Sequence, residues 1–224
     1  MFKTETFENN KLPSEAELAQ MLDISLATLR ESLMMLALEG YITKRHGAGN
    51  YVHPSTLDFE NRIFYDECLR RNGYSVRRKV IEQLITPADD EVAAMLGIPC
   101  SAAILRSTKI HFANKQPAIL AITSIPQSLL VNPALEAIEE ADFQYLHEMI
   151  WKYCRRNLAH SLNEYVPLAL SENLSALFEL PAGAPIIANR QVFYDTFDTP
   201  VMHSFSYFNP DFHKVRVLQN WALR

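Results

Sequence analysis

The sequence predicts an α+β protein made of two domains that are joined by a short connecting segment. Residues 1–53 contain two helix patterns followed by two short strand patterns, with tight turns between them. Residues 74–224 alternate strand and helix patterns, which is typical of an antiparallel sheet with helices packed on it. The chain has 224 residues, of which 48% are hydrophobic, and this is enough to build a core in each domain.

The first helix of the small domain is predicted to begin just after Ser14. The Ser14 hydroxyl can accept a hydrogen bond from a free backbone N–H at the helix start, and Glu17 stands where a capping box needs an acid. Leu18, Met21 and Leu22 then fall on one face of the helix, so we expect that face to be buried. The eleven residues before Leu12 carry no apolar stripe and predict no earlier helix.

The second helix is predicted to begin after a turn at residues 23–25, with Ser25 as its N-cap. Apolar residues then recur at helical spacing through about Glu39, which predicts one buried face. Gly40 follows the pattern and is typical of a helix C-terminus. The apolar residues of this face are Leu26, Leu29, Leu33 and Leu36.

Two short β-rich runs follow at residues 41–45 and 50–52, with a glycine-containing tip between them. They predict a β-hairpin. A helix, a tight turn, a second helix and a hairpin together make a winged helix-turn-helix. In this fold the second helix enters the major groove of DNA and the hairpin, or wing, lies beside it.

The same segment resembles the DNA-binding domain of the GntR family. The matching pieces include Leu12-Pro13-Ser14-Glu15, Thr28-Leu29-Arg30 and Gly47-Ala48-Gly49. The resemblance implies a homodimer that binds a palindromic DNA operator. It also implies that the second helix and the wing contact DNA through Thr28, Arg30, Lys44, Arg45, His46 and Gly47.

The small domain, or head, also departs from the family pattern at positions where the family contacts DNA. Ala16, Leu26 and Ala27 stand where the family usually has Arg, a basic residue and a small hydroxyl residue. The helix that the family carries before Leu12 is apparently missing, and residues 1–56 hold five basic against seven acidic side chains. These departures leave an alternative function open: a metabolite-binding dimeric module whose degenerate head no longer binds DNA.

Residues 54–73 are predicted to connect the two domains. Pro54 ends the hairpin strand because proline has no backbone N–H to donate. Apolar residues recur at helical spacing from Phe59 to Leu69, which indicates a connecting helix with one buried stripe. This helix is expected to end at Asn72-Gly73.

The larger domain is predicted to hold six strands and three helices. The strands fall at residues 79–86, 102–112, 118–125, 157–169, 185–194 and 200–208, and the helices at 87–96, 143–153 and 171–180. A tail with Val215 and Val217 follows. This region resembles the UTRA effector-binding domain of the HutC subfamily, whose fold is similar to that of chorismate lyase. The segments that carry the resemblance include Gln116-Pro117, Ile125-Pro126, Pro181-Ala182-Gly183-Ala184-Pro185 and Ser206-Tyr207-Phe208.

The UTRA resemblance implies a pocket for a small anion, often a sugar phosphate. Two basic residues of the family correspond here to Lys109 and His111, which strand alternation places on one face. Thr123, Tyr165 and Tyr207 are further candidates for contact with the effector. The alternatives to effector binding are that the two basic residues lie on a solvated face of the sheet and that the tyrosines have structural roles.

The next strand departs from the family at Ala121. An acid that binds sugar hydroxyls commonly stands at that position, so the usual phosphosugar effector is in doubt. A smaller or more apolar anion, such as an organic acid, would suit Ala121, Ile119 and Thr123 better.

Other classes of function find little support in the sequence. No run of residues approaches the length of a membrane span, and the N-terminus does not look like a signal peptide. Three widely spaced cysteines fit a reducing cytoplasm. The net charge of −5 argues against a general polyanion binder, so any contact with nucleic acid must come from a local patch.

We find no motif for a metal, a cofactor or a catalytic nucleophile. No histidine or cysteine pair has ligand spacing, the chain has six glycines and no phosphate-binding glycine loop, and Glu139-Glu140 fits a solvated helix start. We therefore expect no cofactor, no metal and no catalytic residue. An enzyme acting on an enol-ether acid, as chorismate lyase does, is the least favoured hypothesis because fold alone does not transfer function.

Overall fold

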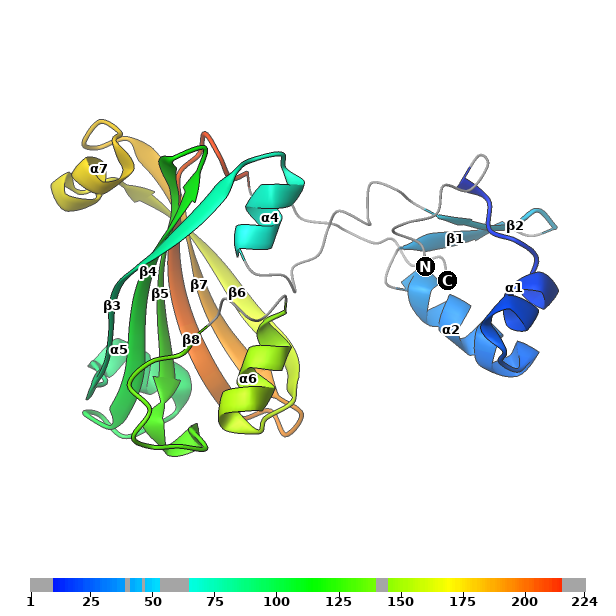
Figure 1. The fold of residues 1–224 in the computed structure, drawn as a ribbon, viewed down its shortest axis with the longest axis horizontal. Helices are drawn as coiled ribbons and strands as arrows, with labels where there is room; N and C mark the ends of the chain where they lie inside the picture. The colour runs from blue at the N-terminus through cyan, green and yellow to red at the C-terminus, as the bar shows by residue number, and fades with distance from the viewer. Residues whose placement is uncertain (1–9, 39–40, 46, 53–64, 140–144, 215–224) are drawn as a thin grey trace. The chain divides into compact units, whose positions relative to one another are not determined.

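A computed structural model describes residues 10–38, 41–45, 47–52, 65–139 and 145–214. The chain divides into two compact units, one of Met1–Asn61 with Val215–Arg224 and one of Arg62–Lys214. We describe each unit by itself (Figure 1). The predictions for the missing first helix, Glu39, Gly40, His46, Phe59 to Phe64, Phe143 and the tail with Val215 and Val217 lie outside the described residues.

The small unit holds two helices and a hairpin in the predicted order. Ser14 and Glu17 form the predicted capping box at the start of α1, and the Ser25 hydroxyl accepts from the Thr28 backbone N–H at the start of α2. The two strands pair antiparallel from Ile42↔Val52 to Arg45↔Gly49. The elements are α1 (Glu15–Leu22), α2 (Leu26–Leu38), β1 (Ile42–Arg45) and β2 (Gly49–Val52).

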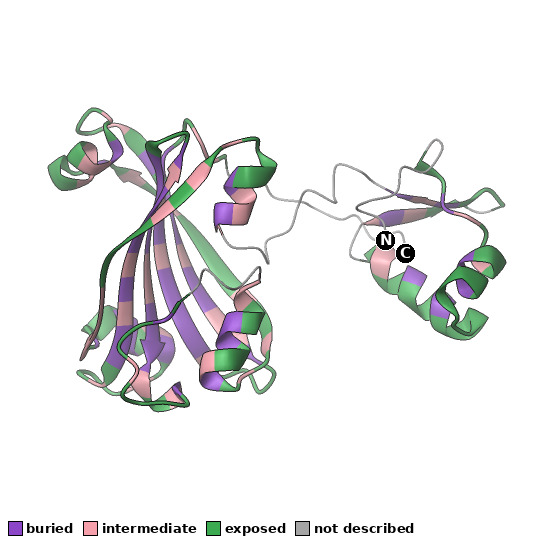
Figure 2. Ribbon diagram, viewed as in Figure 1, coloured by how far each residue is buried: buried purple, intermediate pink, exposed green. Residues whose placement is uncertain are grey.

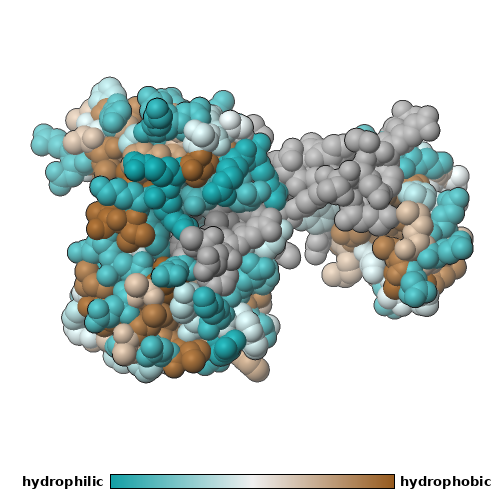
Figure 3. Space-filling model, viewed as in Figure 1, coloured by the Kyte–Doolittle hydropathy of each residue, from teal (hydrophilic) through white to brown (hydrophobic). Residues whose placement is uncertain are grey.

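The core of the small unit is smaller than the apolar pattern predicted. Met21, Leu22 and Leu26 are 58%, 44% and 38% exposed, so the prediction that they are buried is wrong. Two short helices and one two-stranded hairpin offer too little surface to cover every apolar side chain. Figure 3 shows hydrophobic residues at the surface of this unit. The buried residues are Leu12, Leu18, Ala19, Leu29, Leu33, Ile42 and Val52.

The large unit is a six-stranded antiparallel sheet with helices on both faces, as an α+β fold predicts. The strand order is β3-β4-β5-β8-β7-β6. Every predicted strand is present, with bounds that differ by at most three residues. The strands are β3 (Val76–Pro87), β4 (Ala103–Ala113), β5 (Gln116–Pro126), β6 (Leu158–Ala169), β7 (Pro185–Asp195) and β8 (Pro200–Phe208). The helices are α4 (Tyr65–Arg71), α5 (Asp90–Leu96), the 3₁₀ helix η2 (Gln127–Leu129), α6 (Leu146–Cys154) and α7 (Glu172–Phe178).

The helices cover the sheet in two pairs. Leu105 of β4 packs with α6, whereas its neighbour Ile104 points the other way and packs with α5. On β5, Ile119 packs with α4 and its neighbour Leu120 packs with α7. The sheet therefore has an α4/α6 face and an α5/α7 face. Figure 1 shows α6 in front of the strands and α5 behind them.

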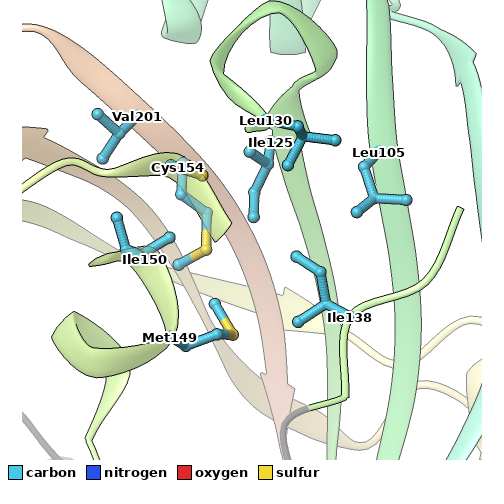
Figure 4. Packing of buried hydrophobic residues seen from close by; sticks show 9 residues of the cluster. Leu105, Ile125, Leu130, Ile138, Met149, Ile150, Cys154 and Val201 are labelled. Carbon is cyan, nitrogen blue, oxygen red and sulfur yellow. The ribbon is translucent and has the colours of Figure 1, made fainter. Parts of the chain in front are cut away.

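Two apolar clusters lie at opposite ends of the α4/α6 face. At one end, Met149 and Ile150 of α6 pack against Leu105 and Ile125 (Figure 4). At the other end, Leu69 of α4 packs with residues from β4, β5 and β8. Figure 2 shows that buried residues run along the central strands.

Candidate functional site

Polar side chains cross the α4/α6 face between the two apolar clusters. Residues that pair directly in adjacent strands point to the same face, so the strand register defines each row. A row that contains Lys109 continues through Ala121, Ser206, Asn189 and Tyr165. The neighbouring row consists of Gln83, Ser107, Thr123, Ser204, Gln191 and Asn163. We call these two rows the polar band.

Lys109 and His111 are each 3% exposed. The alternative of a solvated sheet face for this pair is therefore wrong. Burying a charged or polar group costs free energy unless it is hydrogen-bonded or paired, so such groups are uncommon in a core without a role. The structure brings Lys109, His111, Thr123 and Tyr165 to the same face of the sheet.

A small cavity of about 10 Å³ lies against the polar band. This is room for about one water molecule. Four apolar residues of the α6 cluster close one side of it, and four polar residues of β3, β4 and β5 line the other. The polar lining residues are Gln83, Ser107, Lys109 and Thr123.

His111 is hydrogen-bonded to Asp66 of α4. Its Nδ1 donates to Oδ1 of Asp66 at 2.5 Å, and Nη1 of Arg78 lies 3.5 Å from Oδ2 of the same carboxylate. Burial raises the pKa of Asp66, but the hydrogen bond and charge of His111, with the charge of Arg78, outweigh it and leave that pKa below its ordinary value. Asp66 therefore remains a carboxylate in this buried site.

Tyr65, the neighbour of Asp66, packs beside the same histidine. Its ring meets those of His111 and Phe208 edge-on, with ring centres 5.6 Å apart in both cases. Burial raises the pKa of Tyr65 to about 12, although a hydrogen bond with Ser206 opposes the shift. This tyrosine thus links α4 to the row of the polar band that contains Ser206.

The structure separates Tyr207 from the other candidates. Tyr207 pairs with Leu120, whereas its neighbour Ser206 pairs with Ala121 in the polar band. Its ring packs with Leu120 and Phe178 on the α5/α7 face. Tyr207 therefore lies on the opposite face of the sheet from Lys109, because a single position along a strand reverses the face, and its contact with an effector stays a prediction. Tyr165, which is 43% exposed, does lie in the band.

Two of the cations that are predicted to contact DNA, Arg30 and Lys44, bind the same acid, Glu15. Nε of Arg30 on α2 donates to Oε2 of Glu15 at 2.7 Å, and Nζ of Lys44 on β1 donates to Oε1 at 3.2 Å. These two bonds lower the pKa of Glu15. The side chains of Arg30 and Lys44 remain 60% and 66% exposed, so both cations face solvent.

Among the remaining candidates that the structure describes, Thr28, Arg45 and Gly47 are also exposed. Thr28 and Ser25 share a 2.8 Å hydrogen bond between their hydroxyls at the start of α2. The Arg45 guanidinium lies 4.1 Å from the centre of the Tyr51 ring on the paired strand. Gly47 has a φ of +73°, a conformation that glycine adopts without strain, at an open tip.

Sequence reasoning missed Asp66, Tyr65 and Glu15. Asp66 and His111 are 45 positions apart, and no local pattern joins them. Glu15 was recognised as part of a helix start, but its contacts with α2 and β1 depend on how the three elements pack. These contacts are tertiary and carry no periodic signal.

Comparison with known proteins decides the family. Residues 71–214 match the UTRA domain, and residues 3–52 match the bacterial regulatory proteins of the gntR family. The chain belongs to the GntR family of UTRA-domain regulators. This is the HutC type that the sequence motifs indicated. As a member of this family the protein is a DNA-binding transcriptional regulator.

Several members of this family resemble the chain over most of its length. The transcriptional repressor NagR of Bacillus subtilis is 24% identical over 203 residues, which are 89% of this chain and 82% of NagR. The regulator GgaR of Escherichia coli is 22% identical, over 91% of this chain and 80% of GgaR. These relatives are named as regulators, so the chorismate lyase hypothesis has no support from them.

Two solved structures show the same fold. The possible regulator YydK of Bacillus subtilis superposes with a TM-score of 0.77 at 20% identity, covering 95% of this chain and 92% of YydK. PhnF of Mycobacterium smegmatis superposes with a TM-score of 0.59 at 18% identity, covering 96% and 94%. Within the described parts of this GntR regulator, no helix is long and apolar enough to cross a membrane.

Proposed function

We propose that this GntR regulator binds a small anionic metabolite at the polar band and that this effector changes its affinity for DNA. The observation that carries the proposal is the buried position of Lys109 within a row of hydroxyl and amide side chains. An ammonium group at 3% exposure strongly favours a nearby negative charge. The protein would act in the cytoplasm, where its DNA operator lies.

The composition of the polar band suggests the class of effector. Lys109 supplies a point charge, and Thr123, Ser206 and Asn189 supply neutral donors and acceptors. Ala121 offers no acid for a set of sugar hydroxyls. We therefore favour a small organic acid over a sugar phosphate.

A thermal-shift measurement with Lys109→Met tests this assignment. A ligand at 100 times its dissociation constant stabilises the native state by about 2.7 kcal/mol, which raises the Tm of a unit of this size by about 5–10 °C. We expect such a rise for small carboxylates or inorganic phosphate with the wild-type protein and none with Lys109→Met. Lys79→Met, an exposed lysine of β3, is the matched control and should respond as wild type does. An equal rise with Lys109→Met would remove Lys109 from the site.

For the DNA-binding head, we propose that a homodimer places α2 in the major groove of each half of a palindromic operator. Thr28 and Arg30 would contact bases or phosphates from α2. The residues of the wing, Lys44, Arg45, His46 and Gly47, would hold the DNA backbone. Arg30→Ala should weaken operator binding by about 1–3 kcal/mol, and an unchanged midpoint in a gel shift would exclude this role.

One observation favours the alternative of a head that has lost DNA binding. Glu15 already engages both Arg30 and Lys44, so DNA phosphates must compete with a carboxylate for these cations. The salt dependence of DNA affinity separates the two functions. Contacts with phosphates make the affinity fall steeply as salt rises, whereas a module that does not bind DNA shows no such dependence.

A further inference from the structure

Helix α4 contacts the sheet through Tyr65, Asp66 and Leu69. Leu69 is fully buried among Ala113, Ile119 and Phe208, and Tyr65 lies edge-on to His111. Asp66, between them in position, binds His111 and Arg78. The contacts of Asp66 add hydrogen bonding and charge to the apolar packing of this seven-residue helix.

The Asp66 carboxylate lies where the family resemblance expects the anion of an effector. His111 corresponds to one of the two basic residues of that site, and Arg78 pairs directly with it across β3 and β4. Lys109, the second basic residue, lies two positions along the same strand on the same face. Asp66 is 9% exposed, so its carboxylate fills the site from within the protein.

The space beside Lys109 has room for about one water molecule in this arrangement. A carboxylate or phosphate ligand is larger, so it enters only if something leaves the α4/α6 face. Asp66 does not line this cavity, but it occupies the same face beyond Lys109, at His111 and Arg78, and its contacts there are ones that an incoming anion can replace. In chain order, α4 is the first described helix of the large unit. It follows residues 53–64, which come after β2 of the small unit.

We infer that α4 is a latch: the Asp66 carboxylate occupies His111 and Arg78 in place of the effector, and an anionic effector releases α4 by taking over the contacts with these two side chains. This inference rests on the proposed effector site. It extends that site from Lys109 to its neighbours His111 and Arg78, which are assigned two alternative anions, one internal and one external. Since the two compete, removing the internal one tightens the binding of the external one.

Cys68 provides a direct readout of the latch. It lies on α4 two residues after Asp66, it is half-buried, and burial raises the pKa of its thiol. Release of α4 exposes the thiol and returns its pKa toward the ordinary value, so a disulfide reagent reacts with it faster. Cys154 on α6 is buried and serves as the internal control. Cys100 is exposed and is replaced by serine in all proteins tested.

The experiment compares Asp66→Asn with Glu67→Gln in the full-length chain. We expect Asp66→Asn to speed the labelling of Cys68 by about tenfold to a hundredfold, the factor that follows from losing a hydrogen bond to a charged group. Glu67 pairs with Arg70 and Arg71 along the helix, so Glu67→Gln removes the same charge from α4 and should leave the rate near that of wild type. The labelling rate of Cys154 should not change in either variant.

Inorganic phosphate is the probe for competition, titrated at constant ionic strength with sodium chloride. We expect phosphate to speed Cys68 labelling in the wild type in a saturable way and to bind Asp66→Asn at least tenfold more tightly. Binding to Asp66→Asn alone would also support the latch, because it shows that Asp66 blocks the site. The inference is overturned if Cys68 in Asp66→Asn is labelled at the wild-type rate. It is also overturned if phosphate binds Asp66→Asn no better than it binds the wild type, which includes the case in which phosphate binds neither protein.

These outcomes are distinct from those that test the proposed function. Phosphate binding that survives Lys109→Met unchanged would overturn the effector site at the polar band. A flat salt dependence of DNA affinity would overturn DNA binding by the head. Neither result alters the rate at which Cys68 reacts in Asp66→Asn.

Discussion

Replacing Glu15 with glutamine is expected to tighten the binding of this regulator to DNA. In the free protein the Glu15 carboxylate accepts hydrogen bonds from Arg30 at 2.7 Å and from Lys44 at 3.2 Å. In the proposed complex both cations turn from this carboxylate to DNA phosphates. Glutamine keeps the shape of the side chain but carries no charge, so the two cations lose their internal competitor.

The size of the effect follows from the exposure of the two ion pairs. The side chains of Arg30 and Lys44 are 60% and 66% exposed, and an ion pair at such a surface contributes about 0.2–1 kcal/mol. Two such pairs amount to about 0.4–2 kcal/mol. The expected gain in affinity is therefore between about twofold and thirtyfold.

Fluorescence anisotropy with a labelled random-sequence duplex measures this gain at several salt concentrations. Glu31→Gln is the matched control, because Glu31 is an exposed acid of α2 and its loss changes the net charge equally. Circular dichroism verifies that the head is folded in both variants. Equal or weaker binding by Glu15→Gln, with the fold intact, would refute the reasoning and show that Glu15 positions the cations rather than competing for them.

Three further predictions concern stability. Ile150→Ala should lower the free energy of unfolding of the large unit by about 2–5 kcal/mol in a denaturant titration, because Ile150 is fully buried in the α6 cluster. Ser14→Ala removes one half of the capping box of α1 and should lower the Tm of the small unit, at a cost of about 0.5–2 kcal/mol. Acid should also weaken the large unit: the pKa of Asp66 is lowered on folding, so its stabilising contribution is complete above the ordinary aspartate pKa of 3.8 and is lost as the pH falls below it. Asp66→Asn should remove that part of the acid dependence, as thermal melts from pH 6 to about pH 3 would reveal.

The sequence predicted the local elements well for identifiable physical reasons. Ser14 and Glu17 form their capping box because both partners lie within one helical turn. The strands of the large unit were found because turn residues such as Asn114 separate runs that are rich in β-branched and other apolar residues, such as those of β4 and β5. These signals are local, and tertiary packing did not override them.

Predictions that needed tertiary information were less successful. The strand containing Tyr207 was correct, but the phase of its alternation is set by pairing with β5 and β7. The exposure of Met21 and Leu22 depends on which surfaces the small unit has available to cover them. The partnership of Asp66 with His111 joins a helix to a strand that the chain reaches much later. Periodicity alone carries none of this information.

The small cavity beside Lys109 has a consequence for how sensitivity to the proposed metabolite evolves. A protein whose binding-competent form is populated one time in a hundred has an apparent dissociation constant about a hundredfold higher than the intrinsic one. Substitutions that loosen the helices over the closed site then shift the concentration at which genes respond. They do so without touching any atom that discriminates between metabolites, so response threshold and chemical selectivity become separately adjustable traits.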